Sequence, residues 1–375
     1  MELVRSVTDE HVLRALMQRR RLTRAELAIE TGISKPTAGE SVRRLSDAGL
    51  IVDTGERTPG GRGRGRVGTY YSLASGVGTA LAVSIAPEGV VAERVNAYGD
   101  VVSRAEHPVT RPARPDMVAT ALRAAAEAAS AAAAAETAPA TAAGAHGAED
   151  RGVRLGVVSA ADPVDRGTGR MIHLPDSPFL LGELDPLQVL GPLVDGPIVV
   201  DNDVNWAARA ERDGTADFAY LFLGEGLGCA IVSDGEVRRG ANGLAGEVAH
   251  LLTTGPDGRA ARFIDVFDAM GLRQPDSTAI DVDRLLAAAP ATHEALGEAV
   301  SGVLAALLAL ADPEYVIVGG PWGSHPALRD AITTATERQP RHAPIRPPSV
   351  LTEPSLTGAR LEALHRLRQA IVTGA

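Results

Sequence analysis

Cysteine is nearly absent from this 375-residue chain, in which Cys229 is the only one. A single cysteine excludes an internal disulfide and every zinc site built from several cysteines. Long apolar runs are also scarce. The longest, about Ala299 to Ala311, is interrupted by Ser301 and Gly302 and is too short to span a bilayer. The first residues, MELVRSVTDEH, lack the apolar stretch of a secretory signal, so we expect a cytoplasmic protein.

Lysine is equally rare, because Lys35 is the only lysine among 37 basic residues. The charge is unevenly distributed. Residues 1–75 contain 13 Lys and Arg against 9 Asp and Glu, a net of +4, whereas residues 76–375 contain 24 against 38, a net of −14. A basic N-terminal part (residues 1–75, the head) on an acidic remainder (the body) indicates that only the head binds a polyanion. The length predicts two or three domains.

The first 50 residues have the pattern of a helix-turn-helix. Apolar residues three and four apart between Thr8 and Arg19 predict a first helix. Thr23 and Glu26 form a capping box that opens a short second helix, which Gly32 ends. Ser34 caps a third helix. Two helices joined by a tight turn, followed by strand, loop and strand, are typical of a winged DNA-binding domain.

The third helix and the loop beyond it supply the candidate DNA contacts. The loop from Arg57 to Arg66 reads RTPGGRGRGR, in which glycines let the backbone approach phosphates and arginines fit a narrow minor groove. A flexible charged hinge is the alternative, but the neighbouring helix-turn-helix favours DNA contact. Glu40 either accepts from cytosine or is simply solvated. The predicted DNA-binding residues are Ser34, Lys35, Thr37, Glu40, Arg43, Arg44, Arg62, Arg64 and Arg66.

The rest of the chain alternates strands with helix-length segments, which is typical of an α/β fold. An alanine-rich segment, with 18 alanines among residues 119–148, becomes low in complexity from Pro139 onward. The strands over residues 154–159 and 197–200 are expected to be parallel because a helix-length segment separates them. Further strands are expected over residues 79–85, 90–95, 101–109, 219–223, 229–232 and 315–318, and helices over 117–135 and 357–372.

Three segments of the body resemble the ROK family of sugar kinases and sugar-responsive repressors. Residues 201–208, DNDVNWAA, are similar to the family stretch E-N-D-A-N-x-A-A. Residues 240–250, GANGLAGEVAH, match the longer and more specific signature G-A-x-G-x-A-G-E-x-G-H. Residues 312–320, DPEYVIVGG, resemble the strand D-P-E-x-I-V-L-G-G. Order and spacing agree from about residue 76 to the C-terminus, and an N-terminal winged helix is typical of the family's repressor branch.

The resemblance implies an α/β fold class: a winged helix-turn-helix over residues 1–75, then a two-lobed actin-like ATPase body. The lobes are expected over residues 76–195 and 196–375, with the C-terminal helix, about 357–372, packing back on the first lobe. In the kinases an aspartate takes the proton from the attacking sugar hydroxyl, and the matching residue here is Asp203, a vestigial position if the phosphate site is lost.

Both phosphate loops of the family are altered in this chain. The first, D-x-G-G-T, corresponds to residues 84–88, SIAPE, which lack the acid and both glycines and contain a proline without a backbone donor. The second, G-T-G-I-G, corresponds to residues 224–228, GEGLG, and Glu225 places negative charge where phosphate would lie. We therefore expect no kinase activity and no cofactor.

The family's zinc site is excluded by composition, but part of its sugar pocket is kept. His250 occupies the zinc histidine position, yet Thr254 to Met270 contains no cysteine, so no metal is expected. The family's P-N-L-P segment is PDSP at residues 175–178, and its G-x-P-G-P-V-D loop is SAADPVD at 159–165, which indicates a different ligand or a lost one. By resemblance, the ligand-binding residues are Asp176, Asn202, Asp203, Glu247 and His250.

Three hypotheses for function remain. The first is a DNA-binding transcriptional regulator, a repressor by resemblance, that forms a homodimer or a dimer of dimers on a pseudo-palindromic operator and responds to a sugar or a related small molecule. The second is a sugar kinase that carries a DNA-binding head. The third is a ligand-independent regulator whose body only dimerises. No membrane partner is expected.

Overall fold

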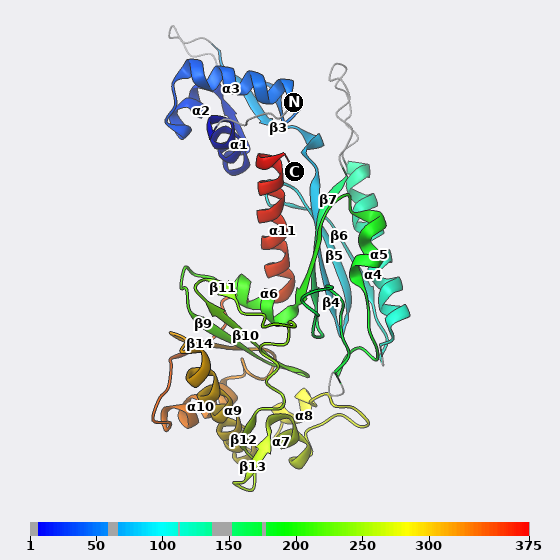
Figure 1. Cartoon of the computed structure of the whole chain (residues 1–375), viewed down its shortest axis with the longest axis vertical. Coiled ribbons are helices and arrows are strands. Elements are labelled where there is room, and N and C mark those ends of the chain that lie inside the picture. The colour runs from blue at the N-terminus through cyan, green and yellow to red at the C-terminus, as the bar shows by residue number, and fades with distance from the viewer. Residues whose placement is uncertain (1–6, 59–66, 112, 137–151, 175–177, 375) are drawn as a thin grey trace.

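The chain forms a small head followed by two α/β lobes along the long axis of the molecule (Figure 1). This computed structural model describes residues 7–58, 67–111, 113–136, 152–174 and 178–374. Four residues predicted to bind DNA or ligand lie outside the described ranges: Arg62, Arg64, Arg66 and Asp176.

The head is a three-helix unit closed by a small sheet. The capping box is confirmed, since the Thr23 hydroxyl accepts from the Glu26 backbone N–H and the Glu26 carboxylate accepts from the Thr23 N–H. Gly32 ends the second helix with φ +70°, which glycine adopts without strain. The elements are α1 (Val7–Arg19), α2 (Arg24–Thr31), α3 (Lys35–Asp47), β1 (Arg21–Thr23), β2 (Ile51–Arg57) and β3 (Thr69–Leu73).

The three-residue strand β1 is a feature that the sequence pattern did not predict. It pairs antiparallel with β3, which also pairs with β2, giving the sheet order β1-β3-β2. Leu22 at its centre is buried in the head core. Because β1 is so short, its pairing depends on tertiary contact rather than on a local alternating pattern.

The first lobe is a mixed five-stranded sheet with the order β6-β5-β4-β7-β8. The pairs β4·β7 and β7·β8 are parallel, and the sequence predicted the parallel arrangement of β7 and β8. The pairs β4·β5 and β5·β6 are antiparallel. The elements are β4 (Thr79–Ala86), β5 (Gly89–Val95), β6 (Val101–Pro108), β7 (Val153–Ala160), β8 (Ile198–Asn202), α4 (Pro115–Glu136) and α5 (Pro186–Leu190).

The second lobe contains another five-stranded sheet, with the order β11-β10-β9-β14-β15, and a separate hairpin β12-β13. Its strands are β9 (Phe218–Leu223), β10 (Leu227–Ser233), β11 (Glu236–Val237), β12 (Leu252–Thr254), β13 (Ala260–Arg262), β14 (Val316–Gly319) and β15 (Ile345–Arg346). Its helices are α7 (Phe263–Ala269), α8 (Val282–Leu286), α9 (Pro290–Ala311) and α10 (Pro326–Glu337).

The helix α9 corrects one expectation from the sequence. The apolar run that was judged too short for a bilayer belongs to a 22-residue helix, which by length and composition is long and apolar enough to cross a membrane. Half of its most apolar stretch is buried inside the protein. Because α9 packs against α10 and β12, it serves here as a core helix of the second lobe.

Two helices join the lobes: α6 (Asp203–Ala210) and α11 (Pro354–Thr373), which cross in the middle of Figure 1. α6 buries Trp206 against the first lobe, where its indole N–H donates to the Val158 carbonyl at 2.9 Å. The opposite face of α6 packs on β9 and β10. α11 packs on α6 and on strands β4 and β7, and Arg209 of α6 forms an ion pair with the buried Glu362 of α11.

The head is attached to the first lobe and to α11 by polar contacts as well as by a shared core. Arg20 makes a bidentate pair with Asp100, at 2.7 and 2.5 Å. Arg368 of α11 donates to the Ala97 carbonyl at 2.9 Å and to the Met17 carbonyl at 3.5 Å. Apolar residues of α1, β4, β7 and α11 belong to one continuous cluster. The C-terminal end of α11 therefore lies directly beneath the head.

Gly358 of α11 makes the closest approach in this joint, and its substitution tests the packing. A Cβ atom at Gly358 would lie 1.8 Å from the Trp206 carbonyl oxygen, whereas a Cβ at Gly39 of α3 would meet nothing within 4 Å. We expect Gly358→Ala to lower the free energy of unfolding by about 2–3 kcal/mol. Gly39→Ala, the matched control, should raise the stability of the head by about 1 kcal/mol. Urea denaturation measures both; equal effects would contradict this packing.

Candidate functional site

The exposed face of α3 carries the predicted DNA contacts that the structure describes. Ser34 caps the helix, its hydroxyl accepting from the Thr37 N–H at 3.2 Å, so Ser34 positions the first turn. Buried Ala38 and Val42 hold the opposite face in the head. Four of the predicted contacts on α3 itself are exposed to solvent: Lys35, Thr37, Glu40 and Arg43.

Arg44 differs from these residues because its guanidinium is engaged within the head. It pairs with Asp9 of α1 at 2.6 Å, and Ser41 donates a second hydrogen bond to the same carboxylate at 2.5 Å. Asp9 is only 5% exposed. A buried carboxylate needs such partners, so this contact fixes α3 on α1. Arg43, in contrast, forms ion pairs with Glu40 and Asp47 on the helix surface.

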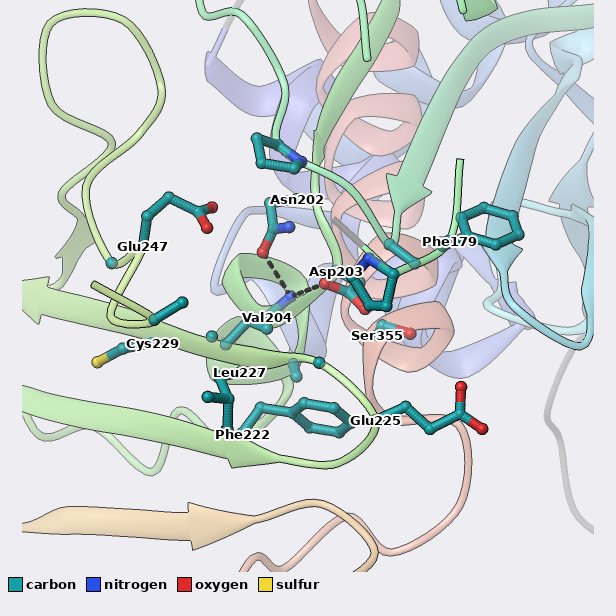
Figure 2. Close-up of a pocket in the computed structure, with 18 of the residues that line it drawn as sticks. Phe179, Asn202, Asp203, Val204, Phe222, Glu225, Leu227, Cys229, Glu247 and Ser355 are labelled. Atoms are coloured by element: carbon teal, nitrogen blue, oxygen red, sulfur yellow. Dashed lines mark hydrogen bonds between the residues drawn. The ribbon is translucent and has the colours of Figure 1, made fainter. Parts of the chain in front are cut away.

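A cavity of about 410 Å³ lies between the lobes and contains most of the predicted ligand residues (Figure 2). The structure brings Asn202, Asp203, Glu247 and His250 into its lining. The β4–β5 and β9–β10 turns and the start of α11 line it as well. The carboxyl ends of parallel strands β7 and β8 meet at this edge, which is where ligands bind in open α/β sheets.

The N-terminus of α6 fixes two of the cavity residues. The Val204 N–H donates to the side chains of both Asn202 and Asp203, at 2.9 and 2.8 Å, as the dashed lines in Figure 2 show. Asp201, just before them, is buried and accepts from Asn205 while pairing with Arg239. The sequence folds this way because an Asn–Asp pair after a buried strand supplies the acceptors that a helix start requires.

The glycine-rich segment of residues 240–250 joins the two lobes at the cavity. Gly243 and Gly246 have positive φ angles of +88° and +99°. A Cβ at Gly243 would lie 2.1 Å from the Val164 carbonyl oxygen, and one at Gly246 would lie 1.7 Å from that of Cys229. Only glycine allows both the conformation and these approaches. The segment thereby presents Glu247 to the cavity.

The two altered phosphate loops form the opposite side of the cavity. Pro87 and Glu88 come from the β4–β5 turn, and Glu225 comes from the β9–β10 turn. Arg111 connects the turns, because its guanidinium pairs with Glu225 at 2.5 Å and donates to the Pro87 carbonyl at 3.4 Å. The region that would cradle phosphates in a kinase is therefore lined by carboxylates and a proline.

Burial raises the pKa of three carboxyl groups around the cavity. It raises the pKa of Asp203 to about 7, and the charge of Glu88 adds to the effect. Burial, with the charge of Asp203, raises the pKa of Glu247 to about 7. The pKa of Asp162 rises to about 8, first through burial and then through the charges of Asp203 and Glu247.

Sequence reasoning missed several residues of this site. Asp162 was noted only as part of an altered loop, yet it is 2% exposed and lies beside the cavity-lining Ala161 and Pro163. The signal was available, because Asp162 lies two residues after the end of the buried parallel strand β7, and Asn202 is the last residue of the neighbouring strand β8. The aromatic walls Phe179 and Phe222 had no such signal, since only tertiary packing brings them together.

No group of three or more His, Cys, Asp or Glu side chains able to hold a metal ion occurs within the described residues. His250 lines the cavity and is exposed. Cys229 is buried, and burial raises the pKa of its thiol to about 12, so the thiol is neutral at physiological pH.

The raised pKa values predict how stability depends on pH. Asp203 binds its proton more tightly in the folded state than in the unfolded state, so its contribution to stability is lost as pH rises from about 4 through 7. We expect Asp203→Asn to raise the melting temperature at pH 8, with the difference from the parent protein narrowing as the pH is lowered toward 4. Glu337→Gln, on the exposed surface of α10, is the control. A melting temperature lower than the parent's at pH 8 would contradict this reading.

Two family profiles match separate parts of the chain. The profile described as ROK family matches residues 144–262, which include the 240–250 segment and the N-terminus of α6. The profile described as winged helix-turn-helix DNA-binding matches residues 5–52.

Individual proteins show the same likeness. The chain is 31% identical over 159 residues to the bifunctional enzyme NanE/NanK of Brucella melitensis biotype 1, covering 39% of this chain and 31% of that protein. It is 24% identical over 255 residues to a putative xylose repressor of a Caldicellulosiruptor species, covering 66% and 59%. Both matches span less than two thirds of the relative's length.

The fold has a full-length counterpart among solved structures. The crystal structure titled as a ROK family transcriptional regulator, homolog of the E. coli MLC protein, superposes with a TM-score of 0.63 at 17% identity and covers all of both chains. At that identity the likeness concerns the fold. The chain thus combines an N-terminal winged helix-turn-helix domain with a ROK family domain.

Proposed function

We propose that this protein is a cytoplasmic transcriptional regulator of the ROK type. In this proposal α3 and the loop from Arg57 to Arg66 bind an operator, and the cavity between the lobes binds a small-molecule effector. The observation that carries the proposal is the exposed face of α3, where Lys35, Thr37 and Arg43 stand free of the core on a helix whose other face is anchored. The likeness to a putative xylose repressor and to a regulator structure supports it.

The domain boundaries expected at residues 75 and 195 belong to the same proposal, with the second one corrected. We place the junction of head and body between β3 and β4. The boundary at residue 195 falls before β8, which belongs to the first-lobe sheet, so we place the junction of the lobes after β8, at α6. A homodimer, or a dimer of dimers, would present two heads to a pseudo-palindromic operator. Repression is the proposed output.

Arg43 and Arg44 provide a matched pair for testing the DNA-binding surface. Arg43→Ala should weaken operator binding about tenfold and reduce its salt dependence, with little change in stability, because its ion pairs are exposed. Arg44→Ala should instead lower the free energy of unfolding by about 2 kcal/mol, because Asp9 loses a partner. Fluorescence anisotropy with DNA from around the protein's own gene, against a scrambled duplex at fixed salt, measures binding. The assignment fails if Arg43→Ala binds as tightly as the parent protein.

A sugar kinase with a DNA-binding head is the second candidate, and Asp203 is the observation that favours it. This carboxyl lies in the cavity with a pKa of about 7, which suits a general base. Against it stand Glu88, Glu225 and Pro87, which occupy the phosphate side of the cavity. These residues repel ATP phosphates or lack the donors that phosphates need.

Phosphoryl transfer is directly measurable. We expect no ADP release above background when the protein is incubated with Mg-ATP and a panel of hexoses and amino sugars. Asp203→Asn should be indistinguishable from the parent protein in this coupled assay. Turnover by the parent that disappears in Asp203→Asn would replace the regulator proposal with the kinase.

A further inference from the structure

The cavity between the lobes has an unusual charge for a site that would hold a sugar or a sugar phosphate. Four carboxylate side chains line it, from Glu88, Asp203, Glu225 and Glu247. No lysine or arginine is among the lining residues in the part of the chain that the structure describes. An anionic ligand would meet carboxyl groups from four different segments of the chain, so the cavity disfavours phosphate esters and nucleotides.

Little within the protein neutralises this charge. Arg111 pairs with Glu225 at 2.5 Å, but it is held at the edge of the cavity by that pair and by the Pro87 carbonyl. Within the described residues, Glu88, Asp203 and Glu247 form no ion pair with a basic side chain. The cavity therefore contains carboxyl groups that no basic side chain of the described residues compensates, in an environment where charges are costly.

Asp162 adds a buried carboxyl group beside the cavity whose hydrogen-bonding capacity is not filled. Only 2% of the residue is exposed, and one carboxylate oxygen accepts from the Leu180 N–H at 3.2 Å. The other oxygen, Oδ1, has no hydrogen-bond partner. Asp162 lies between the lining residues Ala161 and Pro163, close enough to Asp203 and Glu247 for their charges to act on it. A buried acceptor left unpaired is costly unless a ligand supplies the donor.

The remaining walls fit an organic cation better than a bare metal ion. Phe179 and Phe222 line the cavity and are seen on its sides in Figure 2. Aromatic faces attract organic ammonium groups, and the volume of about 410 Å³ suits a small molecule. The Asn202 amide and His250 add polar groups that can bond hydroxyls.

We propose that the cavity selects a protonated amino polyol, such as an amino sugar with a free amine, over neutral sugars and sugar phosphates. The ammonium group lies among Asp203, Glu247 and Glu88, and the hydroxyls bond the remaining polar groups. This inference rests on the effector site of the proposed function and names the class of its ligand.

Binding of such a cation is coupled to proton release. In the empty cavity the pKa values of Asp203 and Glu247 are about 7 and that of Asp162 is about 8. An ammonium ion favours the ionised carboxylates, so these groups lose protons when it binds. The amine of an amino sugar must itself carry a proton to bind, so affinity should be highest near neutral pH and fall both as the carboxylates are protonated at lower pH and as the amine loses its proton at higher pH. The other charged groups that face the ligand or the cavity edge are Glu88, His250, and Glu225 with its partner Arg111.

Isothermal titration calorimetry with matched ligands tests the proposal on the full-length protein. The probes are glucosamine, galactosamine and mannosamine, each against its neutral parent sugar, with glucose 6-phosphate as the anion. We expect at least one amine to bind about tenfold more tightly than its neutral parent. At pH 6, where the free amine is already protonated, binding should release protons, as measured by comparing buffers of different ionisation enthalpy. A neutral sugar or the phosphate ester binding as tightly as the amines, or no binding by any of the three amines, would overturn the proposal.

Two variants separate charge recognition from general folding. Glu88→Gln should weaken amine binding at least threefold while the affinity for the neutral parent sugar is unchanged, because Glu88 is an exposed turn residue that acts by charge. Glu337→Gln removes an equally exposed carboxylate far from the cavity lining and should change neither affinity. Equal effects of the two variants on amine binding would count against the proposal.

The DNA-binding assay keeps this inference distinct from the proposed function. Specific operator binding without amine binding overturns the ligand class and leaves the regulator intact. Amine binding without specific operator binding overturns the regulator proposal and leaves the ligand class intact. If the amine that binds in calorimetry also shifts the anisotropy titration, both proposals are supported by one ligand.

Discussion

The contact between α6 and α11 is the constraint on which the rest of the structure depends. The backbone of α11 approaches the Trp206 carbonyl so closely that only glycine fits at position 358. The buried Glu362 pairs with Arg209 across the same interface. α6 is thereby held between the two sheets, with Trp206 against the first lobe and its opposite face against β9 and β10. Both lobes are positioned through this one short helix.

The cavity follows from that arrangement. Asn202 and Asp203 stand at the N-terminus of α6, so their position relative to Glu247 is set by how α6 packs, not by their own loop. The glycine-rich segment closes the other side by lying against backbone from both lobes. Carboxylates gathered in a partly dry space raise one another's pKa values, and this repulsion gives the site its preference for positive charge.

The same packing connects the cavity to the head in space. α11 begins at the cavity, where Pro354 and Ser355 line it, and ends beneath the head, where Arg368 bonds the backbone of both α1 and the first lobe. Arg20 and Asp100 add a second attachment. Packed residues thus connect the cavity continuously with the DNA-binding helix. A ligand whose affinity differs between two relative positions of the lobes can act on the helix through this packing. Such coupling requires a difference in affinity between the two states.

The sequence alone determined the features that depend on local chemistry. The capping box at Thr23, the cap at Ser34, the strand segments and the glycine-rich signature are encoded by neighbours in the chain, and the structure confirms those elements. Tertiary structure decided what distant residues make together: the short strand β1, the engagement of Arg44 by Asp9, and the buried state of Asp162 beside the cavity. The family motifs placed Asp203 and Glu247 in one pocket by resemblance. Charge repulsion and burial act through space, so no local pattern revealed that Glu88 and Glu225 line the same cavity or that Asp162 is buried beside it.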